Sequence, residues 1–146
     1  MRFSIAAATA VFGAIAAAAP ASQSTGAPDP NTYENIDISD FTVRKNDGIQ
    51  AVFFKLSGKN ATDLDCSASN PGFPSDVITC GETKYRFALY PGSTTEFGLR
   101  LYHELGLAVG FYGEGDVPTY CHAGGNGPDD FVCSQVNPTT IVIDGF

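Results

Sequence analysis

The sequence predicts an all-β fold, a compact antiparallel β-barrel or sandwich stapled by two disulfides. Apolar and polar residues alternate in several short stretches, which is the pattern of strands that are buried on one face. Gly and Pro separate these stretches, and no window shows the 3.6-residue period of an amphipathic helix. Four cysteines in a chain with an export signal complete the prediction, because exported thiols are commonly paired.

The first residues are typical of a secretory signal peptide rather than of the folded domain. Met1-Arg2 is a short basic start, and residues 3–19 are apolar or small, with Ala-rich cleavage sites. The stretch is too short and too Ala-rich to span a membrane. We expect residues 1–18 to be the signal peptide, residues 19–31 a flexible N-terminal segment, and residues 32–146 one exported domain.

The first predicted strand changes phase in its middle. Ile36 and Ile38 alternate with polar residues, and Phe41 and Val43 alternate in the opposite phase. A bulge or bend at Ser39-Asp40 accounts for this change. Three later strands are predicted, with alternating apolar positions at Val52, Phe54 and Leu56, at Tyr85, Phe87 and Leu89, and at Ile141 and Ile143, the last strand also containing Val142.

The longest alternation spans residues 97–111. As one strand it would far exceed the usual length of about 5–6 residues. Two strands joined by a tight turn within residues 103–106 fit the pattern better, and this makes His103 an exposed turn residue. The apolar positions of the two strands are Phe97, Leu99, Leu101, Leu105, Leu107, Val109 and Phe111.

The charge balance narrows the class of partner. Of the 8 basic residues, Arg2 leaves with the signal peptide, whereas all 16 acidic residues remain. Nucleic acid and anionic membranes require clustered Lys and Arg, so neither is expected as a partner. The acidity suits a protein that stays dispersed outside the cell, and no cofactor is expected.

The four cysteines can pair in three ways. Sequential pairing, Cys66 with Cys80 and Cys121 with Cys133, closes two short loops at low entropic cost. Each such bridge stabilises the fold by roughly 3 kcal/mol through loss of unfolded-state freedom. A zinc site is the competing interpretation, but the sequence contains no Cys-x-x-Cys pair and the export route oxidises thiols. We therefore expect no metal.

Catalytic residues are scarce, since the sequence has 2 histidines. His103, Glu104 and Arg100 form a conceivable acid–base set, of the kind that a small secreted ribonuclease uses on an antiparallel sheet. Adjacent strand residues point to opposite faces, however, so His103 and Glu104 converge only if a turn reorients them. We therefore assign no catalytic residue.

Residues 120–133 form the most informative segment of the sequence. Two cysteines enclose Gly124-Gly125-Asn126-Gly127-Pro128, a run that suits neither a helix nor a regular strand. We expect a stapled, sharply folded loop that serves as a structural clamp or as a recognition surface. His122 with Asp129 and Asp130 could hold a divalent metal, but Asp side chains in such turns commonly accept hydrogen bonds from backbone N–H groups.

One modification site is predicted. Asn60-Ala61-Thr62 is an N-glycosylation sequon in a predicted surface turn, with Asn60 as the acceptor. The similar segment Asn137-Pro138-Thr139 fails because proline occupies its middle position.

The cysteine-flanked segment carries a family resemblance. Its pattern is Tyr120-Cys121-x-Ala123-Gly124-Gly125-Asn126-Gly127-Pro128-x-Asp130-Phe131-Val132-Cys133. This pattern closely resembles the C-terminal signature of the Alternaria major allergen family, a group of small secreted fungal β-barrel proteins. Ile38-Ser39-x-Phe41, followed by Arg44-Lys45, is similar to that family's first strand. Cys66-Ser67-Ala68 and Cys80-Gly81-Glu82 are similar to the segments that carry the family's first disulfide pair. The resemblance covers most of the exported chain.

The resemblance implies a compact β-barrel with bridges Cys66–Cys80 and Cys121–Cys133. Members of the family are not known as enzymes. They act as allergens and as effectors or elicitors toward plants, through binding to plant defence proteins of the thaumatin-like class, and some are thought to carry small phenolic ligands at a dimer interface. We therefore expect a secreted, extracellular, non-enzymatic binding protein. The alternatives are a ribonuclease-type hydrolase and a structural protein of the fungal cell wall or spore surface.

Two departures from the family pattern bear on binding. Dimeric members have an extra cysteine before the first strand, whereas residues 20–65 contain none, so a monomer or a non-covalent dimer is expected. His122 stands where the type member has arginine, and Asp129 where it has lysine, which changes the charge that a partner meets. The candidate binding residues are Tyr120, His122, Asp129 and Asp130.

Overall fold

The structure, a computed structural model, describes residues 26–145. The predicted signal peptide and residues 19–25 lie outside this range. Strands and loops make up the whole of the described range, which contains no helix, so the predicted all-β class is confirmed. Consequently, within residues 26–145 no helix is long and apolar enough to cross a membrane.

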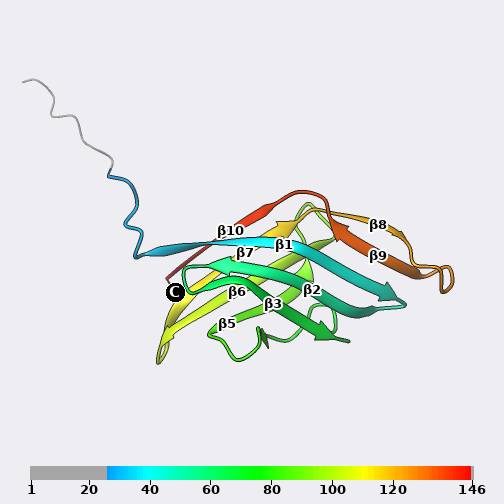
Figure 1. Ribbon diagram of the computed structural model, residues 1–146, viewed down its shortest axis with the longest axis horizontal. Coiled ribbons are helices and arrows are strands. Elements are labelled where there is room, and N and C mark those ends of the chain that lie inside the picture. The colour runs from blue at the N-terminus through cyan, green and yellow to red at the C-terminus, as the bar shows by residue number, and fades with distance from the viewer. Residues whose placement is uncertain (1–25, 146) are drawn as a thin grey trace, which may run out of the picture.

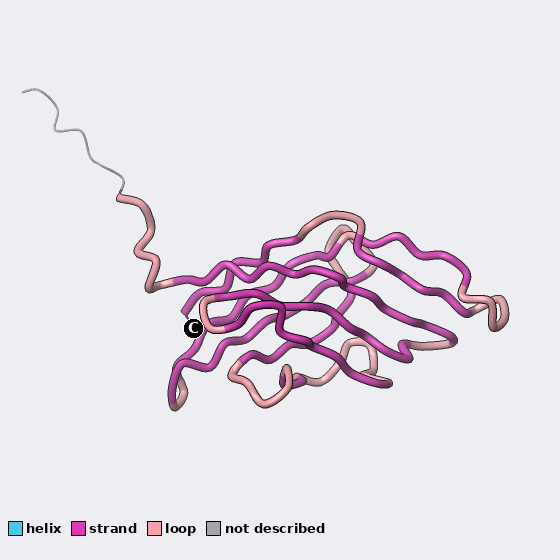
Figure 2. The backbone as a smooth tube through the Cα atoms, viewed as in Figure 1, coloured by secondary structure: helices cyan, strands magenta, loops and turns pink. Residues whose placement is uncertain are grey.

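Ten strands run roughly along the long axis of the molecule (Figure 1), with loops at both ends and further loops along its upper and lower edges (Figure 2). Their bounds are β1 Tyr33–Asn46, β2 Ile49–Gly58, β3 Ala61–Ser69, β4 Ile78–Thr79, β5 Tyr85–Pro91, β6 Phe97–Gly106, β7 Val109–Val117, β8 Thr119–Ala123, β9 Asp130–Gln135 and β10 Thr139–Gly145.

All pairings between these strands are antiparallel, and they form a nearly closed barrel in the order β3-β2-β1-β10-β7-β6-β5-β4. Strand β9 pairs with β1 and with β8, off this path. The two ends of the order, β3 and β4, are joined by the disulfide between Cys66 in β3 and Cys80 just after β4. The disulfide therefore closes the barrel between β3 and β4, where no ladder of backbone hydrogen bonds joins the two strands.

Strand β1 changes partner in its middle. Residues 33–38 pair with β10, and residues 42–46 pair with β9. Between them the register against β2 shifts, and Asp40 has a φ of 54°. The side chain of Gln135 fills the gap: its Oε1 accepts from the Phe41 N–H at 3.1 Å, and its Nε2 donates to the Ile38 carbonyl at 2.9 Å. The predicted bulge at residues 39–40 is confirmed, and an amide side chain completes its backbone hydrogen bonds.

The inward faces of the strands form one hydrophobic core. Phe54 and Phe87 meet edge to face near its centre, with ring centroids 4.9 Å apart. The alternating positions predicted for β2, β5 and β10 are all buried: Val52, Phe54, Leu56, Tyr85, Phe87, Leu89, Ile141 and Ile143.

The predicted turn within residues 103–106 is wrong. Strands β6 and β7 pair as far as Gly106 opposite Val109, and the turn is Leu107-Ala108. His103 therefore lies inside β6 and is 4% exposed, whereas Leu107 is 97% exposed. The alternation of apolar residues continues past the end of the sheet, where no second layer is present to bury them, so periodicity alone misplaces the turn.

Candidate functional site

The predicted stapled loop joins β8 to β9. Cys121 and Cys133 are directly opposite each other in the antiparallel pair, and their sulfurs are bonded. The loop between the strands turns at Gly125 and Gly127, which have φ values of 92° and 112°. These are left-handed conformations that favour glycine, so the Gly-rich run is a requirement of the turn.

Asp130 organises this loop from inside. Its side chain is fully buried, and its Oδ2 accepts from the Asn126 N–H at 3.0 Å and faces the Arg44 Nη2 at 3.4 Å. A Cβ at Gly124 would lie 2.4 Å from the same carboxylate, so this glycine makes room for it. The Oδ1 atom is buried without a hydrogen-bond partner among the described residues. Asp130 thus belongs to the interior of the loop.

The other three candidate binding residues lie on the surface. Tyr120 is 68% exposed, and His122 and Asp129 are exposed as well. Tyr120 and His122 point away from the core in β8, an edge strand that pairs with β9 alone. They form a small polar-aromatic surface beside the disulfide, which suits contact with a protein partner.

The loop does not assemble the metal ligands that its sequence offered. The His122 and Asp129 side chains are exposed, whereas the Asp130 carboxylate is used inside the loop. Within residues 26–145, His, Cys, Asp or Glu ligand atoms gather at one place, Glu96 with Cys121 and Cys133. Both sulfurs of that group are already joined in the disulfide.

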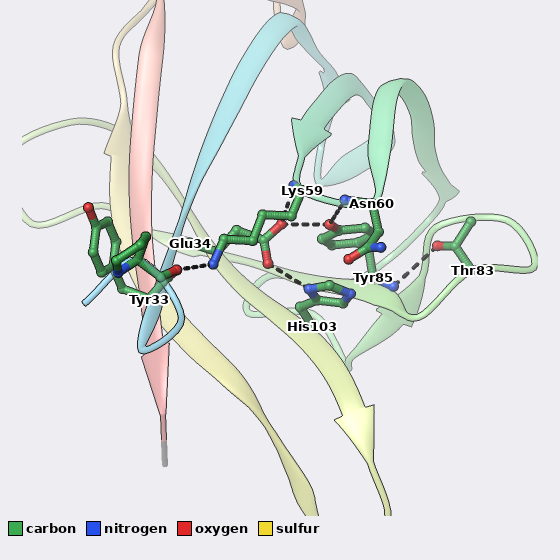
Figure 3. Close-up of polar contacts among 8 residues, drawn as sticks. Tyr33, Glu34, Lys59, Asn60, Thr83, Tyr85 and His103 are labelled. Carbon is green, nitrogen blue, oxygen red and sulfur yellow. Dashed lines mark hydrogen bonds and ion pairs between the residues drawn. The ribbon is translucent and has the colours of Figure 1, made fainter. Parts of the chain in front are cut away.

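A second polar site lies at the opposite end of β1, and no sequence argument anticipated it. The Glu34 carboxylate is buried, and its Oε1 accepts from the Tyr85 hydroxyl at 2.6 Å and from the Lys59 backbone N–H at 2.6 Å. Its Oε2 lies 2.6 Å from His103 Nδ1, and the His103 ring stacks on Tyr85 with centroids 4.0 Å apart (Figure 3). Burial, and then the hydrogen bond to Glu34, raise the pKa of Tyr85.

This cluster changes the interpretation of His103. Its Nδ1 atom is used by Glu34, while the neighbouring Glu104 turns to the other face and pairs with Arg86 at 2.8 Å. Arg100 pairs with Glu114 at 3.1 Å. The three residues of the conceivable acid–base set therefore have separate partners and are not paired with one another.

Sequence reasoning missed Glu34, because one glutamate in a strand is typical of a solvent-exposed position. Its partners are 25, 51 and 69 residues away along the chain. One clue was available: Glu34 lies in phase with Ile36 and Ile38, the inward positions of the first strand.

The fold and these two sites define a class: a small antiparallel β-barrel, closed by one disulfide and carrying a second disulfide at a surface loop. The chain belongs to the family described as Alternaria alternata allergen 1, whose model matches residues 38–133. The family recognised from the cysteine-flanked signature is therefore confirmed.

Individual relatives support the assignment. The chain is 68% identical to "Effector protein PevD1" of Verticillium dahliae over 99% of its own length and 94% of that protein. It is 32% identical to "Major allergen Alt a 1" of Alternaria alternata, over 98% of this chain and 96% of the allergen. A crystal structure of Alt a 1 matches with a TM-score of 0.63 and 30% identity, covering 77% of this chain and 94% of that one.

Proposed function

We propose that this chain is a secreted effector that acts on plants by binding, and that it is a potential allergen. The observation that carries the proposal is the 68% identity to a protein named as an effector, over nearly the whole of both chains. The 32% identity to a protein named as a major allergen supports the second part. The proposed location is extracellular, including the fungal cell wall or spore surface.

The chain acts by binding rather than by catalysis. The side chains of His103, Glu104 and Arg100 are each paired with a residue outside this set, so the three are not linked into one acid–base system. Incubation of the purified protein with RNA tests the hydrolase alternative. Cleavage that disappears in the His103→Ala variant would overturn the binding proposal.

The proposed partner is a plant defence protein of the thaumatin-like class, as the family resemblance implies. The proposed contact surface is the exposed group Tyr120, His122 and Asp129. An edge-strand tyrosine beside a rigid disulfide is suited to be an anchor, because little side-chain freedom is lost when it is covered. Asp130 is left out of the contact surface because its carboxylate is inside the loop.

Binding to a purified plant thaumatin-like protein tests this assignment. We expect the triple variant Tyr120→Ala, His122→Ala, Asp129→Ala to lower affinity at least about tenfold, which corresponds to roughly 1.4 kcal/mol. Leu107→Ser, at the far end of the barrel, is the matched control and should bind normally. Equal binding by the triple variant and the wild type would refute the proposed surface.

The protein is proposed to be a monomer or a non-covalent dimer. All four cysteines of the sequence form the two intrachain bridges, which leaves none for a bridge between chains. A non-reducing gel is the direct test, and a dimer band that collapses under reductant would refute the proposal.

A small phenolic molecule is a further proposed ligand. A hollow of about 410 Å³ near the β6–β7 turn is lined by Val77, Tyr102, His103, Val109 and Phe111 together with polar neighbours, which suits an aromatic ring with hydroxyl groups. Titration with a phenolic compound, followed by tyrosine fluorescence, tests this. A response that is unchanged in Phe111→Ala would remove this hollow as the binding place.

A further inference from the structure

The N-glycosylation sequon lies in the turn between β2 and β3. Asn60 is exposed, and Thr62 is exposed two residues later in β3. Asn60-Ala61-Thr62 is the one sequon in the sequence. The transferase acts on the chain during export, so the folded structure must tolerate the product. An exposed asparagine in a hairpin turn meets that requirement.

The backbone on either side of the acceptor is held firmly. The Asn60 N–H donates to the Tyr85 hydroxyl at 3.0 Å, and the Lys59 N–H donates to Glu34 Oε1 at 2.6 Å. Tyr85 in turn donates to the same Glu34 oxygen. Figure 3 shows Asn60 beside the Tyr85 ring, with the Tyr85 hydroxyl between Asn60 and the Glu34 carboxylate. The turn therefore presents Asn60 in a fixed place beside β5 and β6.

A polar hollow opens next to the acceptor. It has a volume of about 350 Å³ and is lined by Asn60, Thr83, Lys84, Tyr85, His103, Glu104 and Leu105. Small-molecule sites commonly measure about 300–1,000 Å³, so this one is of a size for a single sugar ring. Its walls offer hydroxyl, ammonium and carboxylate groups for sugar hydroxyls, and Leu105 offers an apolar contact for an N-acetyl methyl group. His103 Nδ1 is used by Glu34, which leaves Nε2 as the ring nitrogen available to a ligand.

We propose that Asn60 carries an N-glycan and that the first N-acetylglucosamine lies in this hollow. In the transfer, the Asn60 amide nitrogen attacks C1 of a lipid-linked diphospho-oligosaccharide. The C1–N bond forms, the C1–O bond to the diphosphate breaks, the nitrogen loses one proton, and the lipid diphosphate leaves. Neither oxidant nor reductant is needed.

The position of the glycan gives it a physical role. The hollow adjoins the β6–β7 turn, where Leu105, Leu107 and Val109 are 49%, 97% and 59% exposed. A bulky hydrated sugar beside this apolar turn shields it from contact with other molecules. The same sugar covers Tyr85 on the side of this hollow.

Intact-mass measurement of the full chain, secreted from a fungal expression host, tests the attachment. We expect a mass excess that peptide N-glycosidase F removes, with conversion of Asn60 to aspartate. Asn60→Gln and Thr62→Ala should secrete at the unmodified mass, and Thr62→Ser, which preserves the sequon, should keep the excess. A wild-type chain at the unmodified mass, or a glycan on another residue, overturns the proposal.

A second measurement tests whether the first sugar lies in the hollow. Endoglycosidase H trims a high-mannose glycan to one N-acetylglucosamine. If that sugar lies in the hollow, the trimmed protein should keep the Tm of the glycosylated protein. Both should exceed Asn60→Gln by about 2–4 °C. In Glu104→Ala the difference between trimmed and sugar-free protein should shrink. Equal Tm values for the trimmed wild type and the sugar-free Asn60→Gln variant would refute the position of the sugar in the hollow, whatever the mass shows.

Discussion

Two buried carboxylates at opposite ends of β1 are used in different ways. Glu34 is near its start, and Asp130 pairs with Asn46 at its end. Both oxygens of Glu34 have partners, which come from the β2–β3 turn, β5 and β6. Asp130 contacts its own loop and Arg44, and its Oδ1 has no hydrogen-bond partner among the described residues. Glu34 therefore joins distant parts of the barrel, whereas Asp130 shapes one loop.

The difference shows how a carboxylate that holds distant strands together can be distinguished from one that holds a single loop. The cost of removing a buried acceptor depends on whether its donors can find water. The Tyr85 hydroxyl and His103 are buried with Glu34. Arg44, by contrast, has a side chain that is 44% exposed, so water can replace Asp130 as its partner. The two sites should therefore respond very differently to the same substitution.

The largest effect is expected for Glu34→Ala. Three donors lose their acceptor, and two of them, the Tyr85 hydroxyl and His103, are buried, so the free energy of unfolding should fall by about 3–5 kcal/mol. Urea denaturation followed by circular dichroism measures this change. Glu82→Gln, at an exposed turn position, is the control and should shift stability by less than about 0.5 kcal/mol. A loss below about 1 kcal/mol for Glu34→Ala would contradict the role assigned to Glu34.

The next comparison is between the two disulfides. They close loops of similar length, with sequence separations of 14 and 12, so chain entropy predicts nearly equal costs of about 3 kcal/mol each. Cys66→Ala with Cys80→Ala should nevertheless cost more than Cys121→Ala with Cys133→Ala, because the first pair also releases β3 and β4. Thermal unfolding of the two double variants ranks them. The reverse order would show that the loop bridge matters more to the barrel than its closure does.

Asp130→Ala should have a smaller effect than Glu34→Ala. Loss of the hydrogen bond to Asn126 and of the contact with Arg44 should lower the free energy of unfolding by about 1–2 kcal/mol. Backbone amide hydrogen exchange should rise at residues 124–129 and stay unchanged around Glu34. Increased exchange throughout the barrel would mean that the two ends are coupled.

The smallest effect on stability is expected at Asp116, a partly buried residue whose carboxylate accepts hydrogen bonds from the β5–β6 turn. Burial acts to raise its pKa, but hydrogen bonds from the Thr94 hydroxyl and from the backbone N–H groups of Thr94 and Ser93 outweigh burial and lower the pKa of Asp116. A lowered folded-state pKa contributes stability above the ordinary value of about 3.9, and that contribution is lost as pH falls through the folded-state pKa. The Tm gap between wild type and Asp116→Asn should therefore be larger at about pH 6 than at about pH 3. A gap that grows toward low pH would contradict the direction of the shift.

Sequence periodicity was informative where burial follows the strand period. The inward positions of β2, β5 and β10 and the bulge at residues 39–40 were all predictable, since alternation and its change of phase are local signals. The end of β6 was not predictable, because Leu107 continues the apolar alternation into a turn with no covering layer. For a related reason, Asp130 was predicted to be a candidate binding residue and His103 an exposed turn residue. Their burial depends on Arg44 and Glu34, partners more than 65 residues away, and pairing at that range leaves no local pattern.

The bridge that closes the barrel has a consequence for the order of folding. Cys66 and Cys80 join the two ends of the strand order, yet they are 14 residues apart in the chain. The search that brings them together is therefore short, because the entropy cost of closing a loop rises with its length. The disulfide can therefore join β3 to the end of β4 before the strands that lie between them in the sheet order have paired. The remaining strands then have to complete a ring whose ends already meet.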